Sequence, residues 1–124
     1  IGVAGTADID TAELLARADT FARSLGGHAR ASWMEQGRRT QRWALVTGAG
    51  AGSKEIRDAA ARGIDTLIVG EGPHHTTVDA PEAGLVIIYA EPSATETLGV
   101  RALAEAASEH FAIPAEFLLL PTGS

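Results

Sequence analysis

Three apolar runs that alternate with helical patterns constrain the fold of this chain most strongly. The runs are RWALVT at residues 42–47, DTLIVG at 65–70 and LVIIYA at 85–90. A run that is apolar throughout, such as the last one, is typical of a strand covered on both faces of its sheet. Strands that alternate with helices indicate an α/β domain. We therefore predict a three-layer α/β fold, with a mixed, largely parallel sheet and helices on both faces.

Further helical and strand patterns fill the rest of the chain. Asp10 and Glu13 have the spacing of a capping box at the start of a predicted helix over residues 10–27. Its apolar stripe consists of Leu14, Leu15, Ala18, Phe21, Ala22 and Leu25. Residues 29–34 and 42–47 are predicted to pair as a hairpin. Helices are also predicted at 53–62, 74–80 and 94–111, the last with an apolar face, and short strands at 1–5 and 115–120.

Composition excludes several classes of function. The 124 residues suffice for one domain over 1–124, and a net charge of −6 argues against nonspecific nucleic-acid binding. The chain has no cysteine, which excludes disulfides and thiolate metal sites. This fits a reducing compartment, and we expect a cytoplasmic protein. No apolar run approaches the roughly 20 residues of a membrane span, so no membrane partner is expected. Because the chain begins at Ile1, we expect a longer parent chain.

Polar, glycine-bearing segments follow three of the predicted strands. They are TGAGAGS at residues 47–53, GEGPHH at 70–75 and AEPSATE at 90–96. In sheets of this class, sites collect at the carboxyl ends of strands, where the N-termini of helices present free N–H groups. We therefore expect any functional site to be built from these three segments.

The first of these segments carries alternate glycines at Gly48, Gly50 and Gly52. Glycines allow successive backbone N–H groups to turn inward and form a nest that binds an anion. The spacing does not match the dinucleotide-binding fingerprint or the P-loop. The alternative is a tight strand-to-helix turn in which Ser53 is the N-cap.

The second segment contains two adjacent histidines, His74 and His75, preceded by Glu71. Neighbouring residues on a helix point about 100° apart, so both rarely reach one metal ion. His75 and Asp79 do have the i, i+4 spacing of a helical metal pair. The alternative is that the histidines cap and line the first turn of a helix.

The third segment contains Glu91 and Glu96. A carboxylate at a strand end is a candidate metal ligand. Ser93 and Glu96 also have the spacing of a capping box, in which the carboxylate would bind the backbone N–H of Ser93. Glu91 precedes Pro92 and is equally natural as a loop corner.

The chain resembles the second half of the NIF-three-like family, whose members are labelled GTP cyclohydrolase I type 2. Three motifs carry this resemblance in the same order: a strand that ends in TGAG, then GE followed by HH, then TE at the start of the last long helix. The resemblance implies two similar α/β lobes with a pair of divalent metal ions (zinc, iron or manganese) in the cleft between them. Glu96 matches a ligand glutamate of the second lobe. Pro92 stands where the family has a ligand histidine. His74, His75, Glu71 and Glu91 would border the cleft.

The resemblance therefore implies one lobe of a metal-dependent hydrolase whose substrate is uncertain, with GTP suggested by the family label. The N-terminal lobe would be missing here, and the metal could be absent from this chain because proline binds no metal. The alternatives are a catalytically degenerate assembly or regulatory module and a nucleotide binder that uses the glycine turn alone. Members of the family form ring-shaped homo-oligomers, commonly hexamers, and the resemblance implies the same here.

Overall fold

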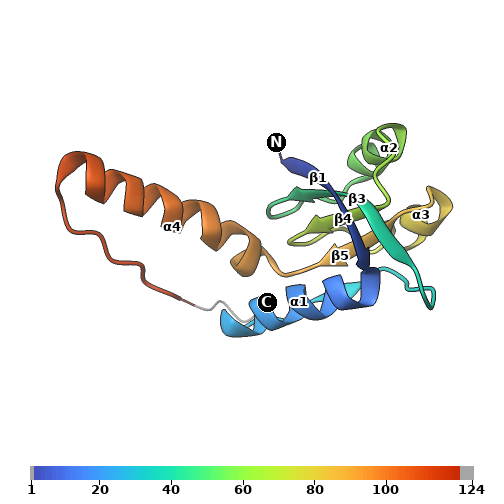
Figure 1. The fold of residues 1–124 in the computed structure, drawn as a ribbon, viewed down its shortest axis with the longest axis horizontal. Helices are drawn as coiled ribbons and strands as arrows, with labels where there is room; N and C mark the ends of the chain where they lie inside the picture. The colour runs from blue at the N-terminus through green and yellow to red at the C-terminus, as the bar shows by residue number, and fades with distance from the viewer. Residues whose placement is uncertain (1, 121–124) are drawn as a thin grey trace.

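The computed structural model describes residues 2–120 (Figure 1). The predicted alternation of strands and helices is confirmed. The elements in chain order are β1 (Val3–Asp10), α1 (Thr11–Ser24), β2 (Arg30–Ala31), β3 (Arg39–Val46), α2 (Ser53–Ala61), β4 (Thr66–Val69), α3 (Thr76–Glu82), β5 (Val86–Tyr89) and α4 (Pro92–Phe111). None of the helices in this described range is long and apolar enough to cross a membrane.

The five strands form one mixed sheet in the order β1-β3-β4-β5-β2. The central strands β3, β4 and β5 are parallel, whereas β1 runs antiparallel to β3 and β2 antiparallel to β5. The predicted hairpin between residues 29–34 and 42–47 was therefore wrong. The two edges of β3 are occupied by β1 and β4, so β2 pairs with β5 and forms the edge of the sheet opposite to β1. The Trp33 Nε1–H holds the connecting segment there by donating to the Leu85 carbonyl at 2.7 Å.

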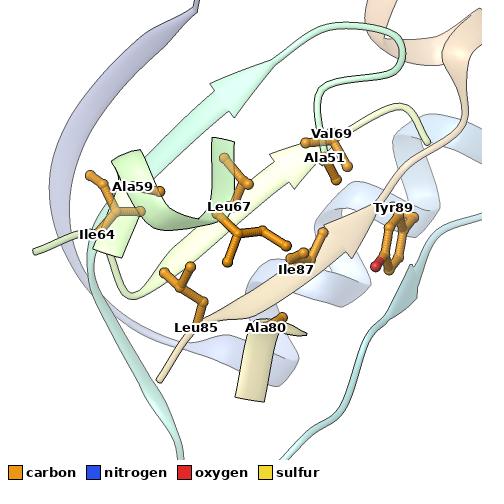
Figure 2. Close-up of a cluster of buried hydrophobic side chains, with 10 residues drawn as sticks. Ala51, Ala59, Ile64, Leu67, Val69, Ala80, Leu85, Ile87 and Tyr89 are labelled. Atoms are coloured by element: carbon orange, nitrogen blue, oxygen red, sulfur yellow. The ribbon is translucent and has the colours of Figure 1, made fainter. Parts of the chain in front are cut away.

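Both faces of the sheet are covered, which confirms the three-layer α/β prediction. On one face, α2 and α3 pack over a cluster of buried side chains from β4 and β5 (Figure 2). The cluster comprises Ala51, Ile56, Ala59, Ile64, Leu67, Val69, Ala80, Leu85, Ile87 and Tyr89. On the other face, a smaller cluster joins Ala22 of α1 and Leu25, which follows that helix, to Ala94 at the start of α4. The strand residues of the first cluster, such as Leu67 and Val69 or Ile87 and Tyr89, are two positions apart, because alternate side chains of a strand point to the same face.

At the start of helix α1, the predicted Asp10 cap is confirmed, but Glu13 does not complete the capping box. The Asp10 carboxylate accepts hydrogen bonds from the backbone N–H groups of Ala12 at 2.8 Å and Glu13 at 3.4 Å. The Glu13 carboxylate forms an ion pair with Arg17 one turn later. The N-cap therefore uses Asp10, and Glu13 strengthens the exposed face of the helix through an i, i+4 pair.

The end of the chain differs from the prediction. The expected apolar face of α4 does not pack on a core, since Val100, Leu103 and Phe111 are 58%, 71% and 67% exposed. The expected strand at 115–120 was wrong, because residues 113–120 have no regular secondary structure. Figure 1 shows that α4 projects away from the sheet and that the segment after it runs back beside α4. This geometry keeps residues 115–120 out of the five-stranded sheet.

Candidate functional site

The carboxyl ends of β3, β4 and β5 meet at one packed junction. The Gly48 N–H donates to the Thr95 Oγ1 at 3.1 Å, which ties the turn after β3 to the first turn of α4. A methyl group at Gly70 would lie 2.8 Å from the Gly48 carbonyl oxygen, 2.8 Å from Thr95 Oγ1 and 2.9 Å from the Pro92 Cα. These approaches are far inside van der Waals contact, so only glycine fits at position 70.

Glu96 lies directly over this junction. Its side chain is exposed, and its Oε1 approaches Gly48 so closely that a Cβ at Gly48 would collide with it. Gly48 also has φ 62, a conformation that favours glycine. The Ser93–Glu96 capping box is absent, because α4 begins at Pro92 and places Ser93 inside the first turn. The Glu96 carboxylate is therefore presented at the strand ends.

Glu91 points to a different neighbour. It occupies the N-cap position of α4 with φ 70, and its Oε1 lies 3.4 Å from the Nδ1 of His28. Its side chain also packs against Gly27, where an added Cβ would lie 2.8 Å from the Glu91 Cγ. Glu91 thus connects the start of α4 to the loop that follows α1, and no pattern in the sequence indicated the His28 contact.

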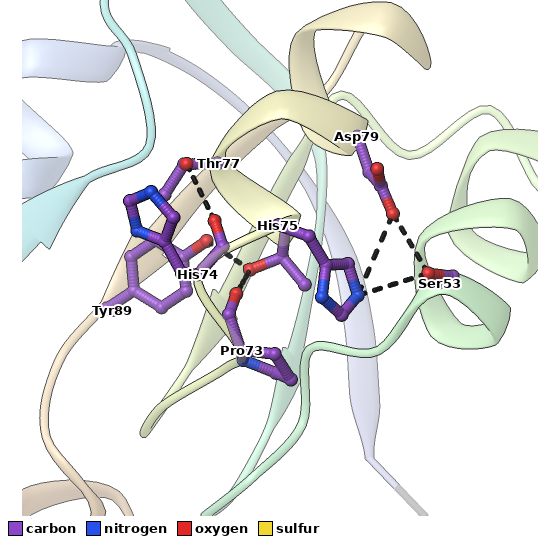
Figure 3. Close-up of polar contacts among 8 residues, drawn as sticks. Ser53, Pro73, His74, His75, Thr77, Asp79 and Tyr89 are labelled. Carbon is purple, nitrogen blue, oxygen red and sulfur yellow. Dashed lines mark hydrogen bonds and ion pairs between the residues drawn. The ribbon is translucent and has the colours of Figure 1, made fainter.

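His75 belongs to the contact between α2 and α3, whereas the His74 side chain points away from it (Figure 3). The His75 Nε2 lies 3.2 Å from the Ser53 Oγ and 3.9 Å from the Asp79 Oδ2, and the Ser53 hydroxyl donates to the same Asp79 oxygen at 2.9 Å. The carbonyl of His74 accepts a hydrogen bond from Thr77 Oγ1 at 2.8 Å. Both histidine side chains are exposed. The i, i+4 proximity of His75 and Asp79 is observed, with Ser53 between them.

The glycine turn uses several of its polar groups internally. The Gly48 N–H is bonded to Thr95, and the Gly50 N–H donates to the Gly48 carbonyl at 2.8 Å. Gly52, rather than Ser53, is the N-cap of α2 and makes no side-chain cap bond. The Glu55 Oε2 lies 2.5 Å from where a Cβ of Gly52 would be, so a carboxylate of the chain itself adjoins this helix N-terminus.

Glu71 is exposed, and its N–H donates to the Gly48 carbonyl at 2.9 Å. Among residues 2–120, no group of three or more His, Cys, Asp or Glu side chains is arranged to hold a metal ion.

Sequence reasoning missed Thr95 and Gly70 as organisers of the junction. The only available signal was the position of Gly70 immediately after a buried strand and of Thr95 in the first turn of a helix.

Fold and site together define a class: an α/β lobe whose parallel strands end at a glycine-lined junction that presents one carboxylate. Residues 1–120 match the model of the family Duf34/NIF3 (NGG1p interacting factor 3), and the chain belongs to this family. This result confirms the resemblance drawn from the three motifs.

Two curated relatives are called GTP cyclohydrolase 1 type 2 homolog. The protein from Deinococcus radiodurans is 46% identical over 79 residues, which are 64% of this chain and 29% of the relative. The protein from Halobacterium salinarum is 44% identical over 80 residues, which are 64% of this chain and 30% of the relative. The chain thus matches less than a third of the length of these relatives.

Solved structures show the same arrangement. The protein ybgI, described as of unknown function, has a TM-score of 0.79 and 31% identity over 96% of this chain and 46% of its own. TTHA1606 from Thermus thermophilus has a TM-score of 0.72 and 25% identity over 98% of this chain and 45% of its own. Both solved chains therefore extend well beyond the part that this chain matches.

Proposed function

We propose that this chain is the second lobe of a two-lobe, hydrolase-like protein and forms one wall of a metal-binding cleft. The observation that carries the proposal is the exposed Glu96 carboxylate held over Gly48 at the ends of the parallel strands. Carboxylate oxygen is an accepted ligand for zinc, iron and manganese. The chain's short match to its relatives supports a further lobe that would face this wall.

The described residues of this lobe do not form a complete metal site by themselves. No set of three His, Cys, Asp or Glu side chains converges in residues 2–120, and Pro92 stands where the family resemblance implies a histidine. Glu96 would thus be one ligand of the metal site, and the other lobe would supply the remaining ligands. In this proposal Gly48 and Thr95 position Glu96, while Glu71, His74, His75 and Glu91 border the cleft.

A second candidate function is an assembly or regulatory module that retains the fold and has lost the chemistry. Pro92 favours it, because proline is well suited to the first position of a helix but offers no metal ligand. We also propose a cytoplasmic location, because the chain has no cysteine, and a ring-shaped homo-oligomer, from the family resemblance. Light scattering after size-exclusion chromatography tests the oligomer.

Restoring the ligand distinguishes the two candidates. Pro92→His would create a histidine and a glutamate at i, i+4, the spacing of a helical metal pair. If the wall has kept its geometry, zinc and manganese titrations should show at least about tenfold tighter binding than in the parent, since one added ligand contributes more than about 1.4 kcal/mol. Adding Glu96→Gln should cancel the gain, whereas Glu105→Gln on the exposed part of α4 should not. Unchanged affinity in a folded Pro92→His variant supports the module instead.

The cyclohydrolase name of the relatives makes GTP the first substrate to test. The candidate anion site is the turn with Gly48, Gly50 and Gly52, where the N–H groups of Gly48 and Gly50 already bond within the lobe and the Glu55 carboxylate lies beside Gly52, so an anion would have to displace these contacts. A ligand at a hundred times its dissociation constant adds about 2.7 kcal/mol to stability, which thermal unfolding detects. We expect GTP to stabilise the chain more than ATP does. Equal or absent stabilisation at millimolar concentration would count against a guanine nucleotide.

A further inference from the structure

The side chains of Ser53, His75 and Asp79 converge on one spot between α2 and α3 (Figure 3). Ser53 is the first residue of α2, His75 is the N-cap of α3, and Asp79 follows within that helix. The distances are 2.9 Å from Ser53 Oγ to Asp79 Oδ2, 3.2 Å from Ser53 Oγ to His75 Nε2 and 3.9 Å from His75 Nε2 to Asp79 Oδ2. One nitrogen and two oxygens thus form a small triangle that joins the two helices.

The size of this triangle suits a metal ion. It contains a point about 2.0 Å from each of the three atoms, which is the distance at which zinc binds imidazole nitrogen and oxygen ligands. An ion at this point would replace the hydrogen bond from the Ser53 hydroxyl to Asp79 and would require little movement of the three side chains. The third donor is a hydroxyl, so the group is not one made of His, Cys, Asp and Glu alone.

The same residue types occur in the Ser-His-Asp catalytic triad, but the geometry differs. In a triad the serine hydroxyl faces Nε2 of the histidine, and the carboxylate accepts from Nδ1–H on the other side of the ring. Here the Ser53 hydroxyl and the Asp79 carboxylate both approach Nε2 of His75, and the hydroxyl proton is directed at the carboxylate. Donor atoms gathered around one point are the arrangement that a metal ion requires.

The charges around the triangle favour a cation. Asp79 forms no ion pair with a lysine or arginine in the described part of the chain, and its contact at 3.9 Å is with His75. Glu55 adds a carboxylate in the first turn of α2, which opposes the partial positive charge of about +0.5 at this helix N-terminus. The adjoining groove is lined by one cationic side chain, Arg57, and by the carboxylates of Asp79 and Glu82.

The site is open to water. The side chains of His75 and Asp79 are 56% and 34% exposed. The adjoining groove has a volume of about 350 Å³, which leaves room for solvent beside the three donors. Zinc is usually four-coordinate, so three protein donors leave a position for a water molecule.

We propose that Ser53 Oγ, His75 Nε2 and Asp79 Oδ2 bind one divalent transition-metal ion of the zinc class, with water as the remaining ligand. Imidazole nitrogen selects zinc, cobalt or nickel over magnesium and calcium, which prefer all-oxygen sites. The bound ion would fasten α2 to α3, the two helices that follow β3 and β4. This site uses neither Glu96 nor a second lobe, so it is separate from the cleft of the proposed function.

Zinc titration of the 124-residue chain tests the site, with binding followed by calorimetry and by NMR of the imidazole nitrogens. We expect one equivalent of zinc to shift the Nε2 signal of His75 and to raise the melting temperature, since the folded chain alone presents the three donors together. EDTA should reverse both effects. Magnesium at the same concentration should produce neither effect.

Single substitutions identify the donors. His75→Ala and Asp79→Asn should each weaken zinc binding at least about tenfold, since even outer partners of metal ligands contribute that much. Ser53→Ala should also weaken it. His74→Ala is the matched control and should leave the affinity unchanged, because the neighbouring ring points away from the triangle (Figure 3). Equal affinity in the parent and in His75→Ala would overturn the proposal, and so would unchanged affinity in Ser53→Ala.

The test also separates this site from the wall that carries Glu96. Glu96→Gln should leave zinc binding at His75 unchanged. The Pro92→His comparison is therefore made in the His75→Ala background, where only the wall can gain affinity. Zinc binding that is lost in Glu96→Gln and kept in His75→Ala would overturn this inference and leave the proposed function standing. The opposite result would confirm the site at His75 whatever the outcome for the wall.

Discussion

The backbone N–H of Gly48 and the side-chain hydroxyl of Thr95 are joined by a hydrogen bond of 3.1 Å between segments that lie 47 residues apart. The Thr95 Oγ1 is also within hydrogen-bond distance of the carbonyls of Glu91 at 3.2 Å and Pro92 at 3.3 Å. One buried hydroxyl thus connects the end of β3 to the first turn of α4. It sets the position from which Glu96 faces the junction.

Thr95→Val should destabilise the lobe by about 1–3 kcal/mol, because the substitution leaves the buried Gly48 N–H without an acceptor. The side chain keeps its volume, so lost packing contributes little. Urea denaturation measures the free energy of unfolding. Thr95→Ser retains the hydroxyl and should recover most of the loss; a serine variant as unstable as the valine variant would contradict the hydrogen-bond argument.

Gly70→Ala should be strongly destabilising, because the added methyl would overlap the Gly48 carbonyl oxygen and the Pro92 Cα. Overpacking against backbone atoms costs about 1–3 kcal/mol or more. Gly99→Ala is the control: Gly99 lies in α4 with nothing within 4 Å of its added Cβ. That variant should gain about 0.5–1 kcal/mol from helix propensity. Thermal unfolding should therefore show a lower melting temperature for Gly70→Ala and a higher one for Gly99→Ala than for the parent.

Leu67→Ala should cost about 2–5 kcal/mol, because Leu67 is 2% exposed in the main cluster and its truncation leaves a cavity. Leu103→Ala makes the same chemical change on the exposed part of α4, where the side chain is 71% exposed. It should change the free energy of unfolding of the isolated chain by no more than about 0.5 kcal/mol. Comparable losses at both positions would show that α4 is already covered in the isolated chain.

Asp19 should contribute to acid sensitivity. The hydrogen bond from the Arg23 guanidinium, and then that from the Ala29 N–H, lower the pKa of the Asp19 carboxyl below its ordinary 3.8. A carboxyl with a lowered pKa contributes stability above its unfolded pKa, and this contribution is lost as pH falls through the folded pKa. The stability difference between the parent and Asp19→Asn should therefore be constant above about pH 5 and shrink below pH 3.8.

An NMR titration of the Asp19 carboxyl carbon checks the direction of this shift. Arg23→Gln removes the main cause and should move the pKa of Asp19 back toward its ordinary value. An unchanged titration in that variant would assign the shift to another group.

Local patterns in the sequence predicted the order of the central elements. The apolar runs at β4 and β5 indicate buried parallel strands whatever their partners, because a strand covered on both faces needs apolar residues at every position. The Asp10 cap was equally predictable, since its carboxylate bonds residues two and three positions further along the chain. The motifs around Gly48, His74 and Glu96 were sufficient to indicate the family.

Other features depend on residues far apart in the sequence. The Ser93–Glu96 spacing satisfies a capping box, but α4 begins at Pro92 and leaves the Glu96 carboxylate over Gly48. The hairpin prediction failed for the same reason, since β2 and β3 are each locally able to form strands but find different partners. Neither the position of Glu96 nor the strand pairing can be predicted from neighbouring residues alone.

The sequence by itself determined the central helices and strands and which polar groups follow the strands, because hydrophobic periodicity and caps act over a few residues. It did not determine the fate of residues 115–120, where the expected strand is absent. Only the tertiary structure decided which strand lies beside which, which way Glu91 and Glu96 point, and that α4 and residues 113–120 leave the core. Those outcomes depend on competition between distant partners for the same sheet edge or the same hydrogen-bonding group. A local pattern shows what a segment can form and cannot show which partner it meets.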